Sequence, residues 1–367
     1  MKRFAIVSVL ILLVTLAGVL ATQRGAAPAP ASQTSGDTTA RAIASANAFL
    51  GMLEAAERAK AAFPFDSPQK TNWSNLPSGA YQRNSLRLGD LTTAKRDAAL
   101  ALVASVLSTD GYRKVTDIMN GDEVLRNRGG GQTGARAGAP GQGGGGGGGR
   151  GGRGGGAAFG AAEYYIAVLG TPSPTTPWMV QFGGHHLAIN VTIVGHNNVI
   201  TPSLPAAQPA RYMLNGQTIR PLGKENDKGF ALIGALNAQQ RQQAILNYRV
   251  SDLVLGPLED GKTIQPEGIL ATALNESQQA MLLDLAHEWV GILNDEGAAA
   301  RMAEIRSNLS RTYFAWSGAT ENGGLAYFRI QGPTVVIEYA PQQGDLDHIH
   351  TIYRDPTNDY GARLVAQ

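Results

Sequence analysis

The sequence predicts an α+β domain: a helical N-terminal part, antiparallel strands in the middle and at the C-terminal end, and further helices between the strands. Two observations support this class. Apolar residues recur at helical spacing in the first third of the chain, whereas short β-branched and aromatic runs bounded by turn residues dominate from residue 163 onward. Helices and strands do not alternate one by one as in βαβ folds, which favours α+β over α/β.

The N-terminal residues 1–21 have the features of a signal peptide. Lys2 and Arg3 precede an almost wholly apolar run, and Val19-Leu20-Ala21 offers a plausible cleavage point. Residues 22–40 are small, polar and rich in Pro, which is typical of a flexible leader. We therefore expect an exported protein, periplasmic or secreted. The alternative is an uncleaved anchor, because the apolar run is near the minimum spanning length.

Composition excludes several classes of protein. The 367 residues include no cysteine, which rules out disulfide scaffolds, thiolate metal sites and cysteine nucleophiles. Lys and Arg number 31 against 29 Asp and Glu, and without Lys2 and Arg3 the two signs are equal. A neutral mature chain is not expected to bind nucleic acid.

Helices are predicted in the N-terminal part over Arg41–Phe63, from Thr92-Thr93 to Leu107, and over Tyr112–Leu125. A Gly-rich run follows over residues 126–162, where poly-Gly has nothing to bury. We predict one domain over residues 41–364, with residues 126–162 as a disordered insertion.

Strands and helices then follow in turn. Strands are expected over 163–170, 178–182 and 186–194, and residues 197–230 are rich in loop signals. Helices are expected to begin near Leu236 and Leu274, and strands over 312–317, 325–331 and 334–339. The helix starts at Leu91, Leu236 and Leu274 share capping residues, which we interpret as similar caps and not as a repeat architecture.

Four of the six histidines fall in two short motifs, His185-His186 and His348-Ile349-His350. On a strand, residues i and i+2 project from one face, so His348 and His350 can reach the same point. Adjacent His185 and His186 face opposite ways, so one of them is expected to join that pair. Three imidazoles around one point suit zinc, copper or iron. The alternative is that each histidine is a hydrogen-bonded structural residue.

Two charged residues accompany these motifs. Glu338 lies in an apolar strand, where a carboxylate must bind a metal, act as a base or form an ion pair with Arg329 or Arg354. Arg354 could orient an anion, or it could belong to a C-terminal turn. Asp345 and Asp347 could bond the imidazoles or solvate a loop.

Known nucleophile and zinc-protease motifs are missing. The sequence has no G-x-S-x-G, and Gly291 stands where H-E-x-x-H requires a second histidine after His287. His287 is therefore expected to be a residue of a helix face.

Several short motifs, spread over roughly residues 45 to 361, carry a family resemblance. They are Trp73-Ser74-Asn75-Leu76-Pro77, Leu107-Ser108 with Gly111-Tyr112, Glu163-Tyr164-Tyr165, Trp178 with Gln181 to Leu187 and Asn190, Tyr327 to Pro333, Glu338-Tyr339, His348 to Thr351, Arg354-Asp355-Pro356 and Asn358 to Gly361. With these motifs the chain resembles a family of bacterial and fungal proteins known only as domain of unknown function 3500. The resemblance implies one contiguous domain, often exported, without an established activity.

Two hypotheses about function remain open. The first is an exported metal-dependent enzyme, hydrolytic or oxidative, with His185 or His186, His348 and His350 as ligands. Glu338 would be a fourth ligand or general base, and Arg354 would orient an anion. The second is a non-catalytic envelope or ligand-binding protein in which the same residues are structural. The expected partner is a small-molecule or envelope ligand, with the membrane involved only if the N-terminal segment stays uncleaved.

Overall fold

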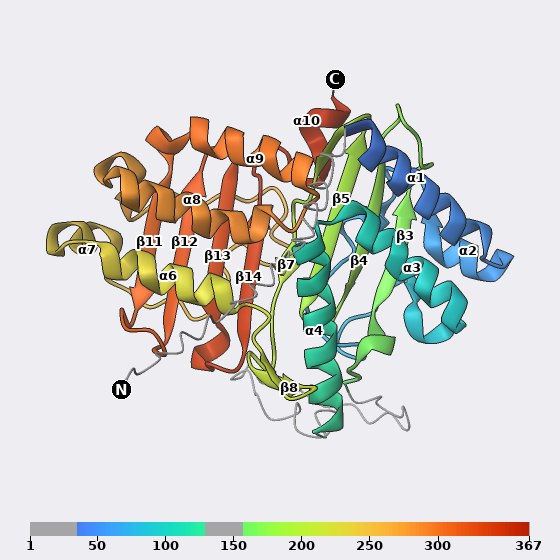
Figure 1. Ribbon diagram of the computed structural model, residues 1–367, viewed down its shortest axis with the longest axis horizontal. Coiled ribbons are helices and arrows are strands. Elements are labelled where there is room, and N and C mark those ends of the chain that lie inside the picture. The colour runs from blue at the N-terminus through green and yellow to red at the C-terminus, as the bar shows by residue number, and fades with distance from the viewer. Residues whose placement is uncertain (1–34, 129–156, 367) are drawn as a thin grey trace, which may run out of the picture. The chain divides into compact units, whose positions relative to one another are not determined.

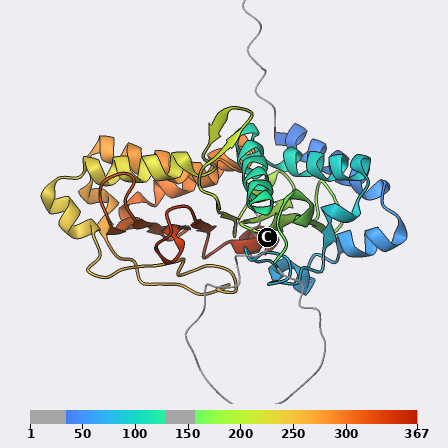
Figure 2. The same cartoon turned by 90° about the horizontal axis from the view of Figure 1, so that it is seen from below.

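The α+β class is confirmed. The computed structural model describes residues 35–128 and 157–366, so the predicted signal peptide, most of the leader and the centre of the Gly-rich insertion lie outside the described residues. Helices cover one face of two mainly antiparallel sheets (Figures 1 and 2). Within the described ranges, no helix has the length and apolar character needed to cross a membrane.

The N-terminal helices differ in their bounds from the prediction. The helix expected over residues 41–63 is two helices, because Glu54 starts a new one, its N–H donating to Glu57 Oε2 at 2.8 Å. The fourth helix begins at Thr109, three residues before the expected Tyr112, because Ser108 Oγ accepts from the N–H of Gly111 at 2.9 Å. The helices are α1 (Ser35–Gly51), α2 (Ala55–Ala61), α3 (Thr93–Val106) and α4 (Thr109–Asn127).

The first sheet has seven strands and forms the N-terminal half of the core. Its centre is an antiparallel meander of three strands, which α1, α3 and α4 cover on one side (Figure 1). The strands are β1 (Ala62–Phe63), β2 (Leu86–Arg87), β3 (Tyr165–Leu169), β4 (Trp178–Gly184), β5 (Leu187–Val194), β6 (Asn197–Val199) and β7 (Leu204–Pro205). A small hairpin of β8 (Tyr212–Leu214) and β9 (Gln217–Ile219) follows.

The second sheet has five strands, ordered β10-β11-β12-β13-β14. They are β10 (Ile269–Leu270), β11 (Tyr313–Gly318), β12 (Ala326–Gly332), β13 (Val335–Pro341) and β14 (Ile349–Arg354). The helices α6 (Gly223–Ala235), α7 (Ala238–Ala244), α8 (Glu276–Val290) and α9 (Asp295–Ser307) accompany this sheet, and a short α10 (Ala362–Val365) ends the described chain. The predicted loop over 197–230 overlaps α6, and α9 is not among the predicted helices.

The two halves repeat the same order of elements. The first half consists of a short strand (β2), a 3₁₀ turn, two helices (α3, α4) and the meander β3-β4-β5, in that order. The second half has the same order, with β10, a 3₁₀ turn, α8 and α9, and the meander β11-β12-β13. The preceding helix pairs also correspond. Arg58 of α2 donates to the carbonyl of Leu50, eight residues earlier, and Arg241 of α7 donates to the carbonyl of Ile233, also eight residues earlier. The helix starts that we interpreted as similar caps therefore belong to a twofold internal repeat.

The repeat halves meet where the paired helices turn. Leu107 and Leu293, which precede the caps of α4 and α9, form an antiparallel bridge. The caps correspond as well: Ser108 accepts from the N–H of Gly111, and Asn294 Oδ1 accepts from the N–H of Gly297 at 3.0 Å. A Cβ on Gly111 would lie 2.2 Å from the carbonyl oxygen of Ile292, so this crossing requires glycine.

Strand β7 joins the two sheets edge to edge. It pairs with β5 on one side, and backbone hydrogen bonds link Ser203 to Tyr353 and Ala207 to Ile349 on the other. Both pairings are antiparallel, so β5 and β14 run the same way and begin at the same end of the fold. The residues that begin β5 and β14 are thereby brought together.

Folded structure extends into the predicted insertion from both sides. Helix α4 continues to Asn127, and the N–H groups of Gly160 and Ala161 donate to Asp122 Oδ2 and Glu123 Oε1, each at 2.7 Å. Residues 126–128 and 157–162 are thus part of the packed domain, because carboxylates on α4 bind the returning chain.

Candidate functional site

A two-residue turn at the end of the β4–β5 hairpin presents the first histidines. Gly184 pairs with Leu187, leaving His185 and His186 as the turn. His186 has a φ of 60°, which few residues other than Gly, Asn, Asp and His adopt readily. A Cβ on Gly184 would lie 2.9 Å from the Tyr164 ring, so the glycine lets this turn approach β3 closely.

The start of β14 supplies the other two histidines. Ile349 points into the main core and is 4 % exposed, while the flanking His348 and His350 face the opposite way. His348 Nε2 lies 2.8 Å from His186 Nε2 and 3.1 Å from His350 Nε2. Three imidazole nitrogens from two distant parts of the sequence therefore converge on one point, which we call the histidine cluster.

The histidine cluster has the geometry of a possible metal site. One ligand atom from each of His186, His348 and His350 lies within 4.8 Å of the others, so this buried triad could hold a metal ion. His186 and His350 are buried, and His348 is the partly exposed member of the cluster.

The hydrogen bonds of His350 fix its tautomer. Asp252 Oδ1 lies 2.8 Å from His350 Nδ1, so the imidazole carries its proton on Nδ1 and donates it to the carboxylate. Nε2 is then an unprotonated acceptor, and Asn75 Nδ2 donates to it at 3.2 Å. A carboxylate on Nδ1 and a free Nε2 pointing inward is the arrangement that metal-binding histidines commonly have.

The electrostatics of the cluster favour the neutral form of two of its imidazoles, His348 and His186. Burial first, and then the neighbouring His350 and His185, lower the pKa of His348 to about 3, against the opposing effect of the Asp252 carboxylate. Burial, followed by the three other histidines, holds the pKa of His186 well below its usual value. Neutral imidazole is the form that binds metals.

His185 faces away from the convergence point. Its Nδ1 lies 2.6 Å from Asp122 Oδ1 on α4, and its ring lies against that of His186, with 3.7 Å between centroids. The hydroxyl of Tyr164 donates to its backbone carbonyl at 2.8 Å. Of the adjacent pair, His186 belongs to the cluster, whereas His185 links the turn to Asp122 of α4.

Glu338 has partners that the sequence analysis did not anticipate. Its buried carboxylate accepts hydrogen bonds from the N–H of Val254 at 3.0 Å, the N–H of Leu255 at 2.8 Å and the hydroxyl of Tyr327 at 2.7 Å. These amides belong to residues 246–268, the covering segment, which crosses the face of the second sheet opposite the helices (Figure 2). Glu338 thus holds the segment that carries Asp252 to His350.

Arg354 holds the same segment. Its Nε and Nη2 donate to the carbonyls of Leu255 and Gly256, both at 2.8 Å, and its Nη1 lies 2.9 Å from Asp260 and Asp359. With its three nitrogens already bonded to four acceptors, Arg354 fits the predicted structural alternative better than anion binding.

The remaining candidates lie outside the cluster. Asp347 accepts from the N–H of Ala210 and Asp345 from the N–H of Asp347, so both hold loop backbone. His196 is exposed at the opposite end of β5 from His186. His287 lies on the exposed side of α8, as expected for a helix face.

Sequence reasoning missed the residues that orient the cluster. Asp252, Asn75 and Asp122 come from three separate segments. Asn75 appears among the residues of the family resemblance, which is the one signal that could have indicated it. Asp252 and Asp122 are single acidic residues without a motif around them in the sequence.

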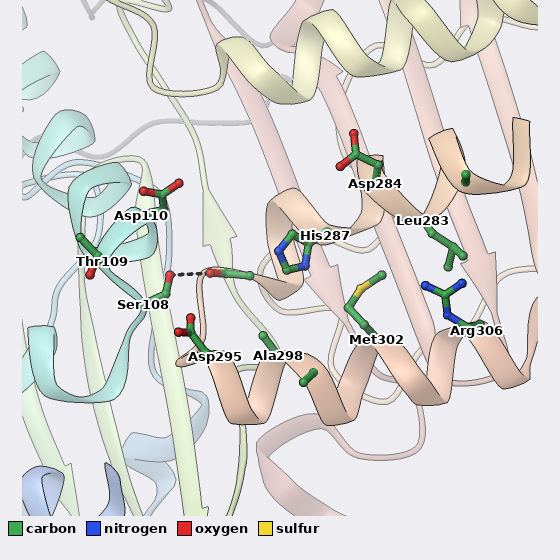
Figure 3. A pocket seen from close by; sticks show the side chains of 13 residues that line it. Ser108, Thr109, Asp110, Leu283, Asp284, His287, Asp295, Ala298, Met302 and Arg306 are labelled. Carbon is green, nitrogen blue, oxygen red and sulfur yellow. Dashed lines mark hydrogen bonds between the residues drawn. The ribbon is translucent and has the colours of Figure 1, made fainter. Parts of the chain in front are cut away.

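A cavity lies on the helical side of the molecule, apart from the histidine cluster. It measures about 780 Å³ and is bounded by α8, α9 and the start of α4, with His287 and Met302 on its walls (Figure 3). Ser108 Oγ at its edge donates to the carbonyl of Gly291 at 2.6 Å and is engaged as a helix cap. This cavity shares no residue with the histidine cluster.

Comparison with known proteins gives a family and no activity. No curated protein and no solved structure shows significant similarity to the chain. A family described as a protein of unknown function, DUF3500, matches residues 35–362, nearly all of the described domain. The chain therefore belongs to the DUF3500 family.

Proposed function

We propose that this protein is a metal-dependent hydrolytic enzyme whose metal is bound by His186, His348 and His350. The observation that carries the proposal is the convergence of three imidazole nitrogens, with the lone pair of His350 Nε2 directed inward by Asp252. Histidines that only fill space would have no reason to direct three ring nitrogens to a common point.

The donor set favours activation of water. Three neutral imidazoles leave the full positive charge on a divalent ion, which lowers the pKa of a coordinated water toward neutrality. Copper electron-transfer sites use a cysteine thiolate, and the chain has none. Zinc is the first metal to test, with copper and iron as the alternatives.

Ligand access is part of the proposal. His348 is the partly exposed member of the cluster, so a small-molecule substrate would reach the metal past its ring. We also propose export to the periplasm or outside the cell, which the N-terminal sequence supports, and a small-molecule or envelope-derived ligand, which the near-equal numbers of basic and acidic residues support.

Metal titration of the mature protein tests the assignment. We expect one zinc, copper or iron ion per chain, a large loss of binding in His348→Ala, and unchanged binding in His196→Ala, because His196 is an exposed histidine outside the cluster. Hydrolysis of an activated ester should be lost with a chelator and restored by the metal. A wild-type protein that takes up none of the three metals would leave the cluster as a structural brace.

A further inference from the structure

A short loop over residues 74–76, the Asn75 loop, packs against the histidine cluster and lies far in the sequence from both histidine motifs. Asn75, 9 % exposed, accepts the N–H of His186 with its backbone carbonyl at 3.0 Å. Its side-chain Nδ2 lies 3.2 Å from His350 Nε2. One residue therefore contacts both histidine motifs, through its main chain and its side chain.

The position of this loop is fixed by Arg83. Its Nη2 donates to the carbonyls of Ser74 and Leu76, both at 2.7 Å, and to the carbonyl of Gly184 at 2.9 Å. Gly184 directly precedes the histidine turn, so one guanidinium fastens the Asn75 loop and that turn together. Asn75 is thus held by contacts on both sides, and such preorganisation is typical of residues in binding sites.

We propose that Asn75 is a further metal ligand, binding through its side-chain Oδ1. This inference rests on the proposed function. A metal bound to His350 would use the Nε2 lone pair that now accepts the Asn75 amide proton, so the NH₂ group could not stay where it is. Rotation of the amide by 180° exchanges Oδ1 and Nδ2 with little change of shape and turns a carbonyl oxygen toward the metal.

The spacing suits this role. Two ligand atoms 3.2 Å apart, each about 2.1 Å from a metal, subtend roughly 100° at it, between the octahedral and tetrahedral values. The His348 separations of 2.8 and 3.1 Å correspond in the same way to angles of roughly 84° and 95°. Angles near 90° belong to five- and six-coordinate ions, so Asn75 as a fourth ligand leaves room for water.

Titration with Co²⁺ tests the role of Asn75 separately from the cluster itself. Asn75→Leu removes the oxygen and keeps the volume, and we expect Co²⁺ affinity to fall at least about tenfold, since even groups that only orient ligands are worth 10–100-fold. Asn75→Asp places a charged oxygen at the same point and should raise affinity about tenfold or more. The visible absorption of bound Co²⁺ should change in Asn75→Leu, because it reports coordination number.

Asn190→Leu is the matched control. Asn190 is another buried amide, bonded to Gln181 and the carbonyl of Pro202, so its loss affects stability while Co²⁺ binding should stay at the wild-type level. Wild-type affinity and spectrum in Asn75→Leu would overturn the Asn75 ligand and leave the proposed function standing. If Asn75→Leu does not fold, unchanged affinity in Asn75→Asp would overturn it equally. A wild-type protein that binds no Co²⁺, Zn²⁺, Cu²⁺ or Fe²⁺ would overturn both.

Discussion

Replacing Glu338 with Gln distinguishes a residue that holds the covering segment from one that binds a metal. The carboxylate accepts three hydrogen bonds from Val254, Leu255 and Tyr327, and it is fully buried. A glutamine keeps one carbonyl oxygen, but its NH₂ group must face at least one of these donors. The change therefore places two hydrogen-bond donors against each other at a fully buried position.

The expected cost follows from these contacts. Losing one hydrogen bond to a charged acceptor costs about 1.5–3 kcal/mol, and a buried donor left unpaired costs about 1–3 kcal/mol. Removing the buried charge recovers part of that cost. We expect the free energy of unfolding to fall by about 2–4 kcal/mol.

Urea unfolding of the metal-free protein measures this effect. Glu259→Gln is the control: Glu259 also lies in the covering segment and pairs with Lys262, but its side chain is 31 % exposed and that of Lys262 is 62 % exposed, so its neutralisation should cost less than about 1 kcal/mol. Metal affinity of Glu338→Gln should fall only modestly, through Asp252. Lost metal binding with unchanged stability would refute this reasoning and make Glu338 a ligand.

Three further predictions follow from the packing of the cluster and of the repeat. His350→Ala should abolish metal binding, whereas Ile349→Ala should keep it and lower the free energy of unfolding by about 2–5 kcal/mol, as equilibrium unfolding and elemental analysis would show. His348 is protonated near pH 6.5 in the unfolded chain but only near pH 3 in the folded chain, so the metal-free protein should lose stability as the pH falls through that window. His348→Gln should lose less stability over the same window. Equal pH dependence of stability in both proteins would contradict the burial argument. Gly111→Ala should cost about 2–3 kcal/mol because its Cβ meets the backbone of Ile292, while Gly234→Ala, in a helix with open space around it, should be neutral or stabilising by up to about 1 kcal/mol in thermal unfolding.

The sequence was sufficient for the elements with strong local signals. The β3–β5 and β11–β13 strands and the helix starts at Thr92, Asn237 and Asn275 lie close to their predicted positions, because periodicity and capping are local properties. Helices α6 and α9 were missed for the same reason. Helix α9 is rich in alanine and charged residues, with little apolar period, and its packing against α8 shows only in the fold.

The candidate site could be predicted only in part. The His-Ile-His spacing indicates that two imidazoles share a face whatever the fold around them, and the structure adds His186 to that face. A buried carboxylate at Glu338 likewise implies partners, but their identity depends on the covering segment, some 80 residues earlier in the chain. Asp252 and Asn75 depend on the same long-range packing, and no local pattern identifies them.

The internal repeat explains where a site of this kind can form. If β3-β4-β5 corresponds to β11-β12-β13, the histidine turn corresponds to the turn between β12 and β13, which contains Pro333 and Thr334 and no histidine. The repeated elements therefore supply two similar scaffolds, and the cluster lies at their junction. Its other residues come from outside the two meanders: β14 supplies His348 and His350, the covering segment supplies Asp252, and the Asn75 loop supplies Asn75. Strand β7 lies between β5 and β14 and fixes their relative positions, so the precision of the cluster comes from the joining of the two halves and not from either half alone.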